Sequence, residues 1–492
     1  MSCLLTTAFN RRRLLRLSLL SLLVVAVTIA LVTKPACAGS YIPLESEVYR
    51  YLKILEAEGL ITTGQLATLP ISRLEGARLT TEARENVCEE TSPRLQGMLI
   101  RLQDEFKMEL ANDESIYLKP LDSLNLRYVN SDGKSFFAQK NRDGVEVRNG
   151  NNAFLDLTTR FDSPYVGVVV KPEVDVSDDG TKATLKKAYL LATIGRAELM
   201  FGKESAWWGP GQNGSILLST NAEPLTTLKL SNSVPYFPLG VGFRGTIFIA
   251  ELEKDRKDVQ SPLLNGIRLD LKPSRYLELG LSKTVIFGGK GRKSGFDTFL
   301  KTLYGGGSNQ NAGFQANDTG DQRAGYDVKV VLPWRWQPVT LYLDAAGEDQ
   351  RHSFPSKWFF LYGVYLPRVL NLDRLELWGE YGTNNDHDFP GVWYTNYAYA
   401  QGYTHKGRII GHHMGPDATD LFLRARYNFD SAAVTVSYEN LTKLNPSRYI
   451  REYYSASLEK ELFHNAQLAI AANYAREDSK KTVVEIGLHY QF

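Results

Sequence analysis

The sequence predicts a mainly-β protein: a transmembrane antiparallel β-barrel of about 18 strands with a small N-terminal periplasmic helical bundle. Three observations predict this fold. The chain ends on a strictly alternating strand, segments of the same period recur from residue 121 onward, and the long connections between them fall at every second position. We expect residues 1–38 to be a signal peptide, 39–115 the helical segment and 116–492 the barrel.

The terminal strand has one apolar and one wet face. Its apolar residues alternate with polar or small ones, in the order Val484, Glu485, Ile486, Gly487, Leu488, His489, Tyr490, Gln491 and Phe492. This is the period of a β-strand, and a final aromatic residue on the apolar face is typical of bacterial outer-membrane barrels, whose last strand closes the ring against the first. We therefore expect outer-membrane lipid around the barrel, and recognition of the strand ending in Phe492 by the barrel-insertion machinery.

The first residues have the pattern of a secretory signal. A basic cluster at 11–16 overlaps the start of a mostly apolar stretch, 14–32, and Ala36-Cys37-Ala38 then fits a small-x-small cleavage site. The apolar stretch is slightly long for a signal, so a retained membrane anchor stays an alternative. A lipoprotein cysteine at this site is a weaker one, because Lys34 stands where that signal needs an apolar residue.

The composition agrees with a barrel and argues against other classes. The 492 residues include 26 Tyr, 22 Phe, 7 Trp and 40 Gly, as expected for many alternating strands with aromatic girdles. Cleavage after residue 38 removes five basic groups and no acidic ones, so the formal charge falls from +2 to below zero and no nucleic-acid partner is indicated. Cys88 is then the last cysteine, which excludes a disulfide or a cysteine-based metal site within one chain.

Residues 41–110 have a helical period. One apolar stripe ends at Gly59, which can cap a helix, residues 72–85 are a second helix candidate, and Ser92-Pro93 has the composition of a helix start. The first and third stripes consist of Val48, Leu52 and Leu55, and of Leu95, Leu99, Leu102 and Phe106. Short helices bury little apolar surface alone, so we expect this segment to pack against itself and against something larger.

From residue 121 onward, apolar residues recur at every second position, in segments near the ~10 residues of a tilted spanning strand. If the strands are numbered from there, the even-to-odd turns are mostly tight. The odd-to-even connections include all the long ones: 130–151, 202–224, 286–322 and 382–417. The Pro-rich segment 231–242 is an exception, because it is long for a tight turn. Such sorting is expected when one rim faces the periplasm and the other faces outward, with the helical segment and the C-terminus at the periplasmic rim.

A Trp-Trp-Gly-Pro-Gly sequence interrupts the alternation inside the connection 202–224. This motif and the distinctive residues after it are Trp207, Trp208, Gly209, Pro210, Gly211, Asn213, Asn221, Glu223 and Pro224. Adjacent tryptophans in a strand-like loop cannot both face lipid, and the glycines permit turns that other residues disfavour. We expect either a loop folded into the barrel mouth, with the indoles as packing wedges, or a platform on which a ligand stacks.

The same run resembles the signature of the capsule assembly Wzi family. A second similar run extends from Ile410 to Leu421 and includes His412, His413 and Asp417. The order of signal peptide, helical segment and long β-region is similar as well. The resemblance implies an outer-membrane barrel whose residues 41–110 form a periplasmic bundle. It also implies a surface lectin, not an enzyme, that helps attach capsular polysaccharide to the cell.

We seek the sugar-binding residues in the connection 382–417. The candidates are Trp393, Tyr394, Tyr397, Tyr399, Asn384 and Asn385. Aromatic rings can pack on the C–H surfaces of sugars, and amide side chains can pair with hydroxyl groups. The alternative is that these rings belong to an aromatic girdle at the outer membrane interface. The sequence does not specify which polysaccharide is bound.

A porin is an alternative function. Such a channel would be lined by residues on the wet faces of the strands, among them Lys186, Arg196, Arg268, Glu278, Glu376, Arg424 and Arg426. Against this alternative, the helical segment and the Trp-Trp loop could both block flow.

An outer-membrane enzyme is a further alternative. It could use the two histidines with Asp417 and Asp420, or a serine near the Trp-Trp motif, but no nucleophile-elbow motif is present. Adjacent histidines on a strand point to opposite faces, so we expect them not to share a metal. Asp386-His387-Asp388 could hold calcium or be a solvated acidic loop. We expect no metal, no cofactor and a monomeric protein.

Overall fold

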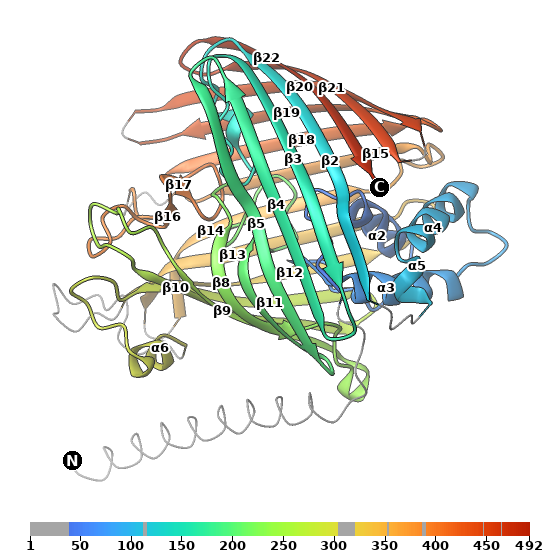
Figure 1. Ribbon diagram of the computed structural model, residues 1–492, viewed down its shortest axis with the longest axis horizontal. Coiled ribbons are helices and arrows are strands. Elements are labelled where there is room, and N and C mark those ends of the chain that lie inside the picture. Colours follow the sequence, from blue (N-terminus) through green and yellow to red (C-terminus); the bar gives the residue numbers. More distant parts are fainter. Residues whose placement is uncertain are drawn as a thin grey trace.

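The computed structural model of the protein is built around one closed β-barrel (Figure 1). It describes residues 39–111, 116–303, 320–351, 354–385, 390–445, 447–463 and 465–492. The predicted signal peptide, 1–38, lies outside the described residues, and so do the three residues of the considered calcium loop, 386–388.

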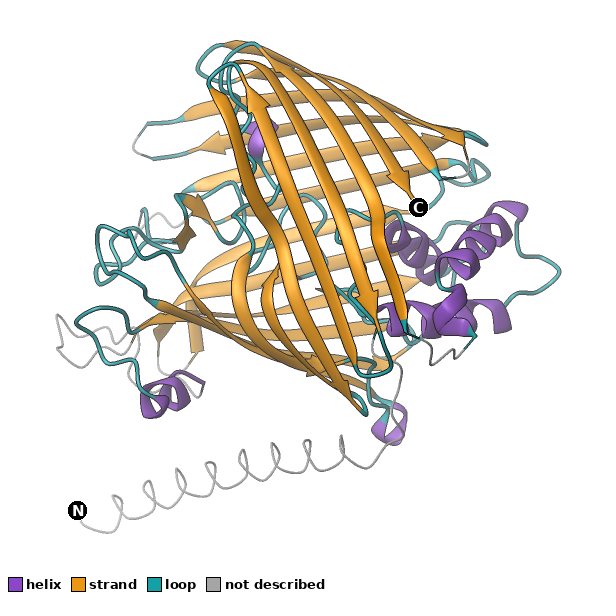
Figure 2. Cartoon of the chain, in the orientation of Figure 1, coloured by secondary structure: helices purple, strands orange, loops and turns teal. Residues whose placement is uncertain are grey.

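The ring consists of 18 antiparallel strands, each paired with its neighbours in the chain (Figure 2), which confirms the predicted fold class. The strands are β2 (Tyr117–Ser131), β3 (Gly150–Asp162), β4 (Val166–Ser177), β5 (Gly180–Ile194), β6 (Ala197–Glu204), β8 (Leu225–Asn232), β9 (Gly242–Glu251), β10 (Leu263–Ser274), β11 (Leu277–Phe287), β12 (Gly320–Leu332), β13 (Val339–Arg351), β14 (Phe354–Leu366), β15 (Leu375–Thr383), β18 (Ala418–Asn428), β19 (Ala432–Lys443), β20 (Tyr449–Phe463), β21 (Ala466–Arg476) and β22 (Lys480–Gln491).

The last strand closes the ring against the first, as predicted. β22 pairs with β21 on one side and with β2 on the other, where Leu488 lies opposite Leu126. The Phe492 amide donates a hydrogen bond to the Asp122 carbonyl oxygen, and the Lys119 ammonium donates one to the main-chain oxygen of Phe492 at 2.8 Å. The chain terminus is thus fixed within the seam, which leaves neither edge of the seam open to strand addition.

The two rims of the barrel differ in the length of their connections, as the sequence predicted. One rim, called the long-loop rim here, carries the described segments 132–149, 205–224, 252–262, 288–303, 384–385 and 390–417. The opposite rim, called the helical rim, has mostly short turns and lies next to the N-terminal helices and the C-terminus (Figure 1).

The long turn 233–241 of the helical rim contacts the helical segment. The Ser72 hydroxyl donates to the Ser233 carbonyl oxygen at 2.7 Å, and the Arg78 guanidinium lies 5.5 Å from the centre of the Phe237 ring. The extra length of this predicted exception therefore has a packing role.

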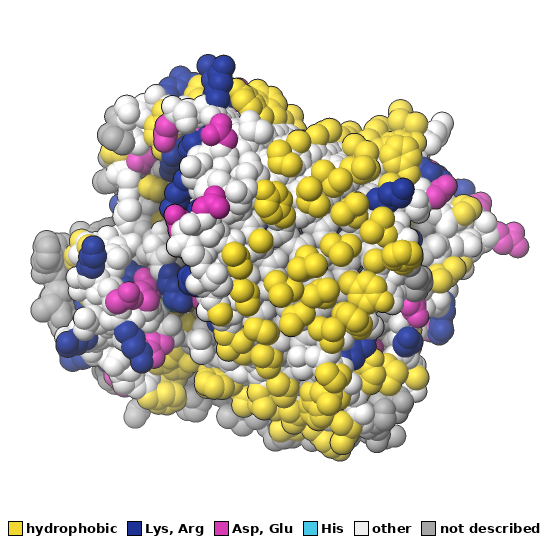
Figure 3. All heavy atoms as spheres, turned by 45° about the horizontal axis from the view of Figure 1, so that its top comes forward, with side chains coloured by type: hydrophobic (Ala, Val, Ile, Leu, Met, Phe, Trp, Pro, Cys, Tyr) yellow, Lys and Arg dark blue, Asp and Glu magenta, His cyan; other side chains and the backbone are white. Residues whose placement is uncertain are grey.

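The outward face of the barrel is apolar between the rims. Residues that alternate with the buried interior side chains, such as Leu190, Leu281 and Val436, are about half exposed. Figure 3 shows apolar side chains covering the wall of the barrel, with charged side chains gathered at its ends. This alternation is the pattern of a lipid-facing barrel. Among the described residues, no helix combines the length and apolarity that crossing a membrane requires.

Among the described residues, four helices precede the barrel, at the right of Figure 1: α2 (Val48–Ala57), α3 (Arg73–Glu85), α4 (Pro93–Glu105) and α5 (Lys107–Leu110). The Ser72 hydroxyl accepts a hydrogen bond from the Glu75 amide at 3.1 Å and begins α3, and Ser92 does the same for α4. The predicted apolar stripes meet in one buried core that includes Leu52, Leu55, Leu79, Leu99, Leu102 and Phe106.

A buried ion-pair network fixes the N-terminal helices to the barrel wall. The Glu56 carboxylate of α2 lies 2.8 Å from the ammonium groups of both Lys272 and Lys329, on β10 and β12. Arg50 of the same helix pairs with Glu376 on β15 at 2.8 Å. Burial raises the pKa of Glu56, but the two lysines outweigh it and hold that pKa below its ordinary value, so the carboxylate stays charged.

Candidate functional site

The Trp-Trp pair forms a two-stranded sheet inside the barrel. β7 (Trp207–Trp208), which belongs to a connection of the long-loop rim, pairs antiparallel with β1 (Thr68–Leu69) of the helical segment. The Gly209 amide extends the pairing by donating to the Ala67 carbonyl oxygen at 2.8 Å. A segment that comes from one rim therefore meets a segment from the other within the lumen.

The two tryptophans belong to different hydrophobic cores. Trp208 is 3% exposed and packs edge-on against Phe248, with ring centres 5.4 Å apart, in a core made largely of long-loop side chains. Trp207 packs in the core of the helical segment, and its indole N–H donates to the Gly211 carbonyl oxygen at 3.1 Å. Neighbouring residues of an extended chain point in opposite directions, so the pair joins the two cores. This geometry favours the packing-wedge interpretation.

Inward-facing wall residues hold β1 in place. The Thr68 hydroxyl donates to the Asp270 carboxylate at 2.7 Å, and the Ala67 amide donates to the Glu278 carboxylate at 3.0 Å. Arg268 pairs with the same Asp270 at 2.8 Å. Arg268 and Glu278 were candidates for the lining of an open porin lumen. They face the interior as predicted, but they bind protein segments there.

The Gly-Pro-Gly turn brings the chain close to the opposite wall. Gly209 has a φ of +130°, and a Cβ at this position would lie 2.7 Å from the Asp344 carboxylate, so a glycine is required. Pro210 and Gly211 follow in a buried turn. The Asn213 amide then donates to the Glu380 carboxylate of β15 at 2.7 Å.

The end of the motif joins two long connections to each other. The Asn221 side-chain amide donates to the Ile409 carbonyl oxygen at 2.9 Å. The Glu223 carboxylate, which precedes Pro224, accepts hydrogen bonds from Lys203 and Lys406. Burial raises the pKa of Glu223, but these hydrogen bonds lower it to about 2 overall. The ion pairs therefore persist at neutral pH.

Three of the predicted sugar-binding aromatics are buried. Trp393, Tyr394 and Tyr399 are 1%, 3% and 0% exposed. Their polar hydrogens are donated, at 3.0, 2.8 and 3.1 Å, to the main-chain oxygens of Lys357, Ile216 and Gly288. Because no ring face is open, their surroundings support a packing role and not the predicted direct contact with a sugar.

The two predicted asparagines differ in exposure. Asn384 is 1% exposed, and its amide group bonds the Gly415 carbonyl oxygen and the Ala418 amide at 2.8 and 2.9 Å, so it fixes the turn into β18. Asn385 is only partly buried, and Tyr397 is 58% exposed. Of the six candidates, Tyr397 and Asn385 are the two that reach the surface.

The adjacent histidines lie on the same side of the chain. Their rings stack with centres 4.5 Å apart and 24° between the planes, because the segment turns here and is not a strand. The expectation that they point to opposite faces is therefore wrong. His413 Nε2 lies 2.8 Å from the Glu439 carboxylate and 3.4 Å from Asp420. The ligand atoms of His412, His413 and Asp420 lie within 4.8 Å of one another.

A lysine from another long connection joins this cluster. Lys140 of the connection 132–149 pairs with Glu439 and donates to the Asn213 side-chain oxygen at 2.9 Å. His412 Nδ1 accepts a hydrogen bond from the Met414 amide at 3.2 Å, which places the proton of the neutral ring on Nε2. Burial lowers the pKa of both histidines well below the ordinary value. The stacked rings, the contact of His413 with Glu439 and the hydrogen bond to His412 Nδ1 fit a structural histidine pair.

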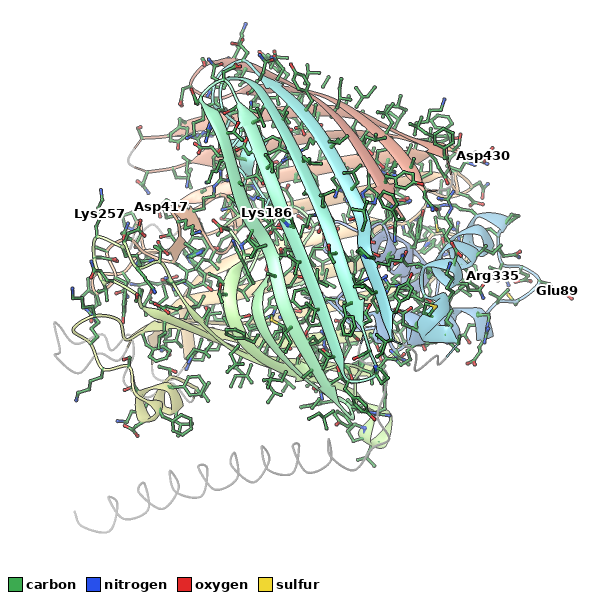
Figure 4. The ribbon with its side chains drawn as sticks, in the orientation of Figure 1. Glu89, Lys186, Lys257, Arg335, Asp417 and Asp430 are labelled. Atoms are coloured by element: carbon green, nitrogen blue, oxygen red, sulfur yellow. The ribbon has the colours of Figure 1, made fainter. Side chains whose placement is uncertain are left out.

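Asp417, also part of the second motif, is buried outside this cluster. Its carbonyl oxygen accepts a hydrogen bond from the Leu444 amide at 2.9 Å, and it lies at the long-loop rim (Figure 4).

Sequence reasoning missed two segments that fill the lumen. Residues 60–71 carry β1, and the connection 132–149 carries Lys140 and Phe137, which stacks on Tyr453 at 4.9 Å. Neither segment has a local sequence signal for this role, because each contact joins residues far apart in the chain.

The exposed part of the long-loop rim includes a surface made by two connections. The Arg256 guanidinium donates to the Gly402 carbonyl oxygen at 3.0 Å, and the Lys257 amide donates to the Gln401 side-chain oxygen at 2.8 Å. Exposed side chains on these joined loops include Lys254, Lys257, Tyr397 and Gln401, called the outer platform here, and the exposed Asp255 lies between the two lysines. Figure 4 shows Lys257 at the outer end of the molecule, far from α2–α5.

A comparison with known families shows to which family the chain belongs. The profile of the family described as capsule assembly protein Wzi matches residues 127–489, which extend from the first barrel strand into the last. The chain belongs to this family. A relative from Klebsiella pneumoniae, an uncharacterised 55.8 kDa protein in the cps region, is 28% identical over 193 residues, covering 38% of this chain and 37% of the relative. The match thus spans little more than a third of that relative's length.

Two of the solved structures similar to this chain are bacterial barrels. Wzi of Escherichia coli, described as an outer-membrane, carbohydrate-binding β-barrel involved in group 1 capsule assembly, has a TM-score of 0.73 to this chain at 19% identity. The match covers 92% of this chain and 100% of the other, so the fold is shared. A Pseudomonas aeruginosa barrel, OccK3 (OpdO), reaches a TM-score of 0.48 at 12% identity over 77% and 96% of the two chains. Membership of the Wzi family places this chain in the outer membrane.

Proposed function

We propose that this barrel binds capsular or another surface polysaccharide at its long-loop rim, without catalysis, and helps attach it to the cell. The helical rim then faces the periplasm and the long-loop rim faces outward. The observation that carries the proposal is the obstructed lumen: segments from both rims meet at the β1–β7 sheet and are bonded to the wall, while a cavity of about 840 Å³ is left beside the helices. A polymer therefore contacts the outer surface and does not pass through the barrel.

The outer platform has suitable chemistry for a polysaccharide. An exposed tyrosine ring packs on sugar C–H groups, the Gln401 amide pairs with hydroxyls, and Lys254 and Lys257 attract acidic sugars. Asn385 lies on the connection that also carries Tyr397. The buried aromatics of this connection hold the platform rigid, which lowers the entropic cost of binding. Recognition of the C-terminal strand by the insertion machinery and a monomeric state remain predictions.

Replacing Tyr397 with Ala is expected to weaken polysaccharide binding about three- to tenfold, because one stacking ring is lost. The measurement is the affinity of the detergent-solubilised protein for purified surface polysaccharide, together with a search for shortened products. The matched control is Tyr165→Ala, since Tyr165 is 57% exposed but lies at the helical rim. Equal affinities of Tyr397→Ala and the unchanged protein would contradict polysaccharide binding by the outer platform. Release of oligosaccharides would contradict the non-catalytic function.

A further inference from the structure

A short helix lies against the barrel near the long-loop rim. α6 (Phe296–Leu303), at the lower left of Figure 1, packs on β10 and β11. The Lys283 ammonium donates to the Thr302 carbonyl oxygen at 2.7 Å, and the Phe299 ring centre lies 6.4 Å from that of Phe287. The helix therefore contacts Lys283 and Phe287 of β11, and the Thr302 hydroxyl also accepts a hydrogen bond from Asn265 of β10.

These two wall residues point away from the lumen. On β11 the interior positions include Glu278, which binds Ala67, and Ser282, which accepts a hydrogen bond from Arg268. Side chains alternate along a strand, so Lys283 and Phe287 face outward together with Leu281, which is 52% exposed. The helix thus lies on the lipid-facing side of the barrel.

Along the barrel axis, α6 lies at the level of an aromatic girdle. Tyr326 on β12 is paired with Leu281, one outward position below Lys283. Its ring packs edge-on against Trp358, with ring centres 5.9 Å apart. Outward tyrosines and tryptophans in barrels lie at the level of the lipid headgroups. α6 is therefore next to the headgroups of the outer leaflet.

The helix turns its polar side toward the barrel and an apolar ring away from it. Thr298 and Thr302 are 8% and 0% exposed, whereas Phe296 is 73% exposed. The Phe296 ring stacks on Phe299, which itself packs on Phe287 of the wall, with the centres of the first two rings 6.1 Å apart. The free side of the helix thus presents the exposed Phe296 ring together with the ion pair of Asp297 and Lys301, and this ring can contact acyl chains.

Basic residues surround this apolar side. The segment 290–301 contains Lys290, Arg292, Lys293 and Lys301 against Asp297 alone. Arg292 donates to the Ala398 carbonyl oxygen at 3.0 Å. Lys290 and Lys293 are exposed, and within the described part of the chain neither forms an ion pair. Exposed lysines at headgroup level attract anionic lipid groups.

We propose that α6, with Lys290 and Lys293, binds a phosphorylated glycolipid of the outer leaflet: Phe296 contacts its acyl chains and the two lysines contact its phosphates. The site lies outside the barrel wall, at the girdle, and not on the outer platform. A membrane lipid therefore fits it better than a free polysaccharide. The proposal does not depend on the sugar specificity of the barrel.

The test uses the full-length protein in nanodiscs that contain either a bisphosphorylated lipid A or the same lipid without phosphates. We expect the amides of residues 296–303 to exchange hydrogen more slowly in the phosphorylated lipid. Lys290→Ser/Lys293→Ser is expected to reduce the bisphosphorylated lipid retained during purification roughly tenfold, measured by mass spectrometry. Phe296→Ser should lower retention of both lipids.

The matched control is Lys254→Ser/Lys257→Ser, which removes two exposed lysines from the outer platform. This control should retain the lipid but bind polysaccharide less well, whereas Lys290→Ser/Lys293→Ser should bind polysaccharide normally in detergent. The two proposals can therefore fail separately. Equal exchange in both lipids, or equal lipid loss in both double variants, would overturn the glycolipid site. Heat-dependent gel mobility confirms that each variant is folded.

Discussion

Replacing Trp208 with Ala is expected to lower the free energy of unfolding by about 3–5 kcal/mol, the usual cost of removing a buried tryptophan side chain. The indole is 3% exposed and fills the space beside Phe248, where a Cβ on Gly266 would already lie 2.8 Å from it. The loss also weakens the β1–β7 sheet, so the segments from the two rims should separate more readily. Urea unfolding in detergent micelles, followed by near-ultraviolet circular dichroism, measures the effect.

The control for this variant is Trp336→Ala. Trp336 is 66% exposed in a turn of the helical rim, where it stacks on Trp334, and its loss should change the unfolding free energy little. Under conditions where Trp208→Ala remains folded, it should bind polysaccharide nearly as well as the unchanged protein. A strong loss of binding with unchanged stability would show that the tryptophan acts on the ligand and not on packing.

Replacing Glu56 with Gln is expected to cost about 3–5 kcal/mol, because it leaves two buried lysines without this shared carboxylate. Lys272 and Lys329 are 3% and 6% exposed, and each lies 2.8 Å from Glu56. The lost ion pairs should mainly weaken the attachment of the helices, since Glu56 belongs to α2 and the lysines belong to the barrel. We expect limited proteolysis to cleave within residues 41–110 much faster in the variant.

The pH dependence of this effect has a defined sign. The pKa of Glu56 is lowered in the folded protein, so its stabilisation is present above the ordinary value of 4.5 and is lost as the pH falls below it. The difference in stability between the variant and the unchanged protein should therefore shrink below pH 4.5. Glu90→Gln is the control, because Glu90 pairs with Arg335 on the surface. An equal loss of stability in both variants would contradict the role of Glu56 in fixing the helices to the barrel.

The barrel could be predicted because its determinants are local in sequence. Alternation defines each strand, and the lengths of the connections define the two rims, so the ring, the closing strand and the four long connections named from the sequence agree with the structure. The helix starts at Ser72 and Ser92 were predictable for the same reason: each serine side chain caps the helix that follows it directly.

The interior could not be predicted because its contacts join distant parts of the chain. Nothing near Thr68 indicates that it would pair with Trp208, 140 residues later. Aromatic composition alone also does not separate an exposed tyrosine from a buried one. Tyr397 and Tyr399 are two residues apart, yet one is 58% exposed and the other reaches Gly288 in the core. The sequence signal for a filled interior was indirect: charged side chains at inward-facing strand positions require partners inside the barrel.

The most direct test of a lumen filled from both rims is electrical conductance in planar lipid bilayers. We expect the unchanged protein to insert without steady ion conduction, because the β1–β7 sheet and the bonded long connections occupy the interior. Glu56→Gln should remain silent as well, since the segments of the long-loop rim stay in place when the helices loosen. Steady ohmic channels from the unchanged protein would contradict the account and favour a porin.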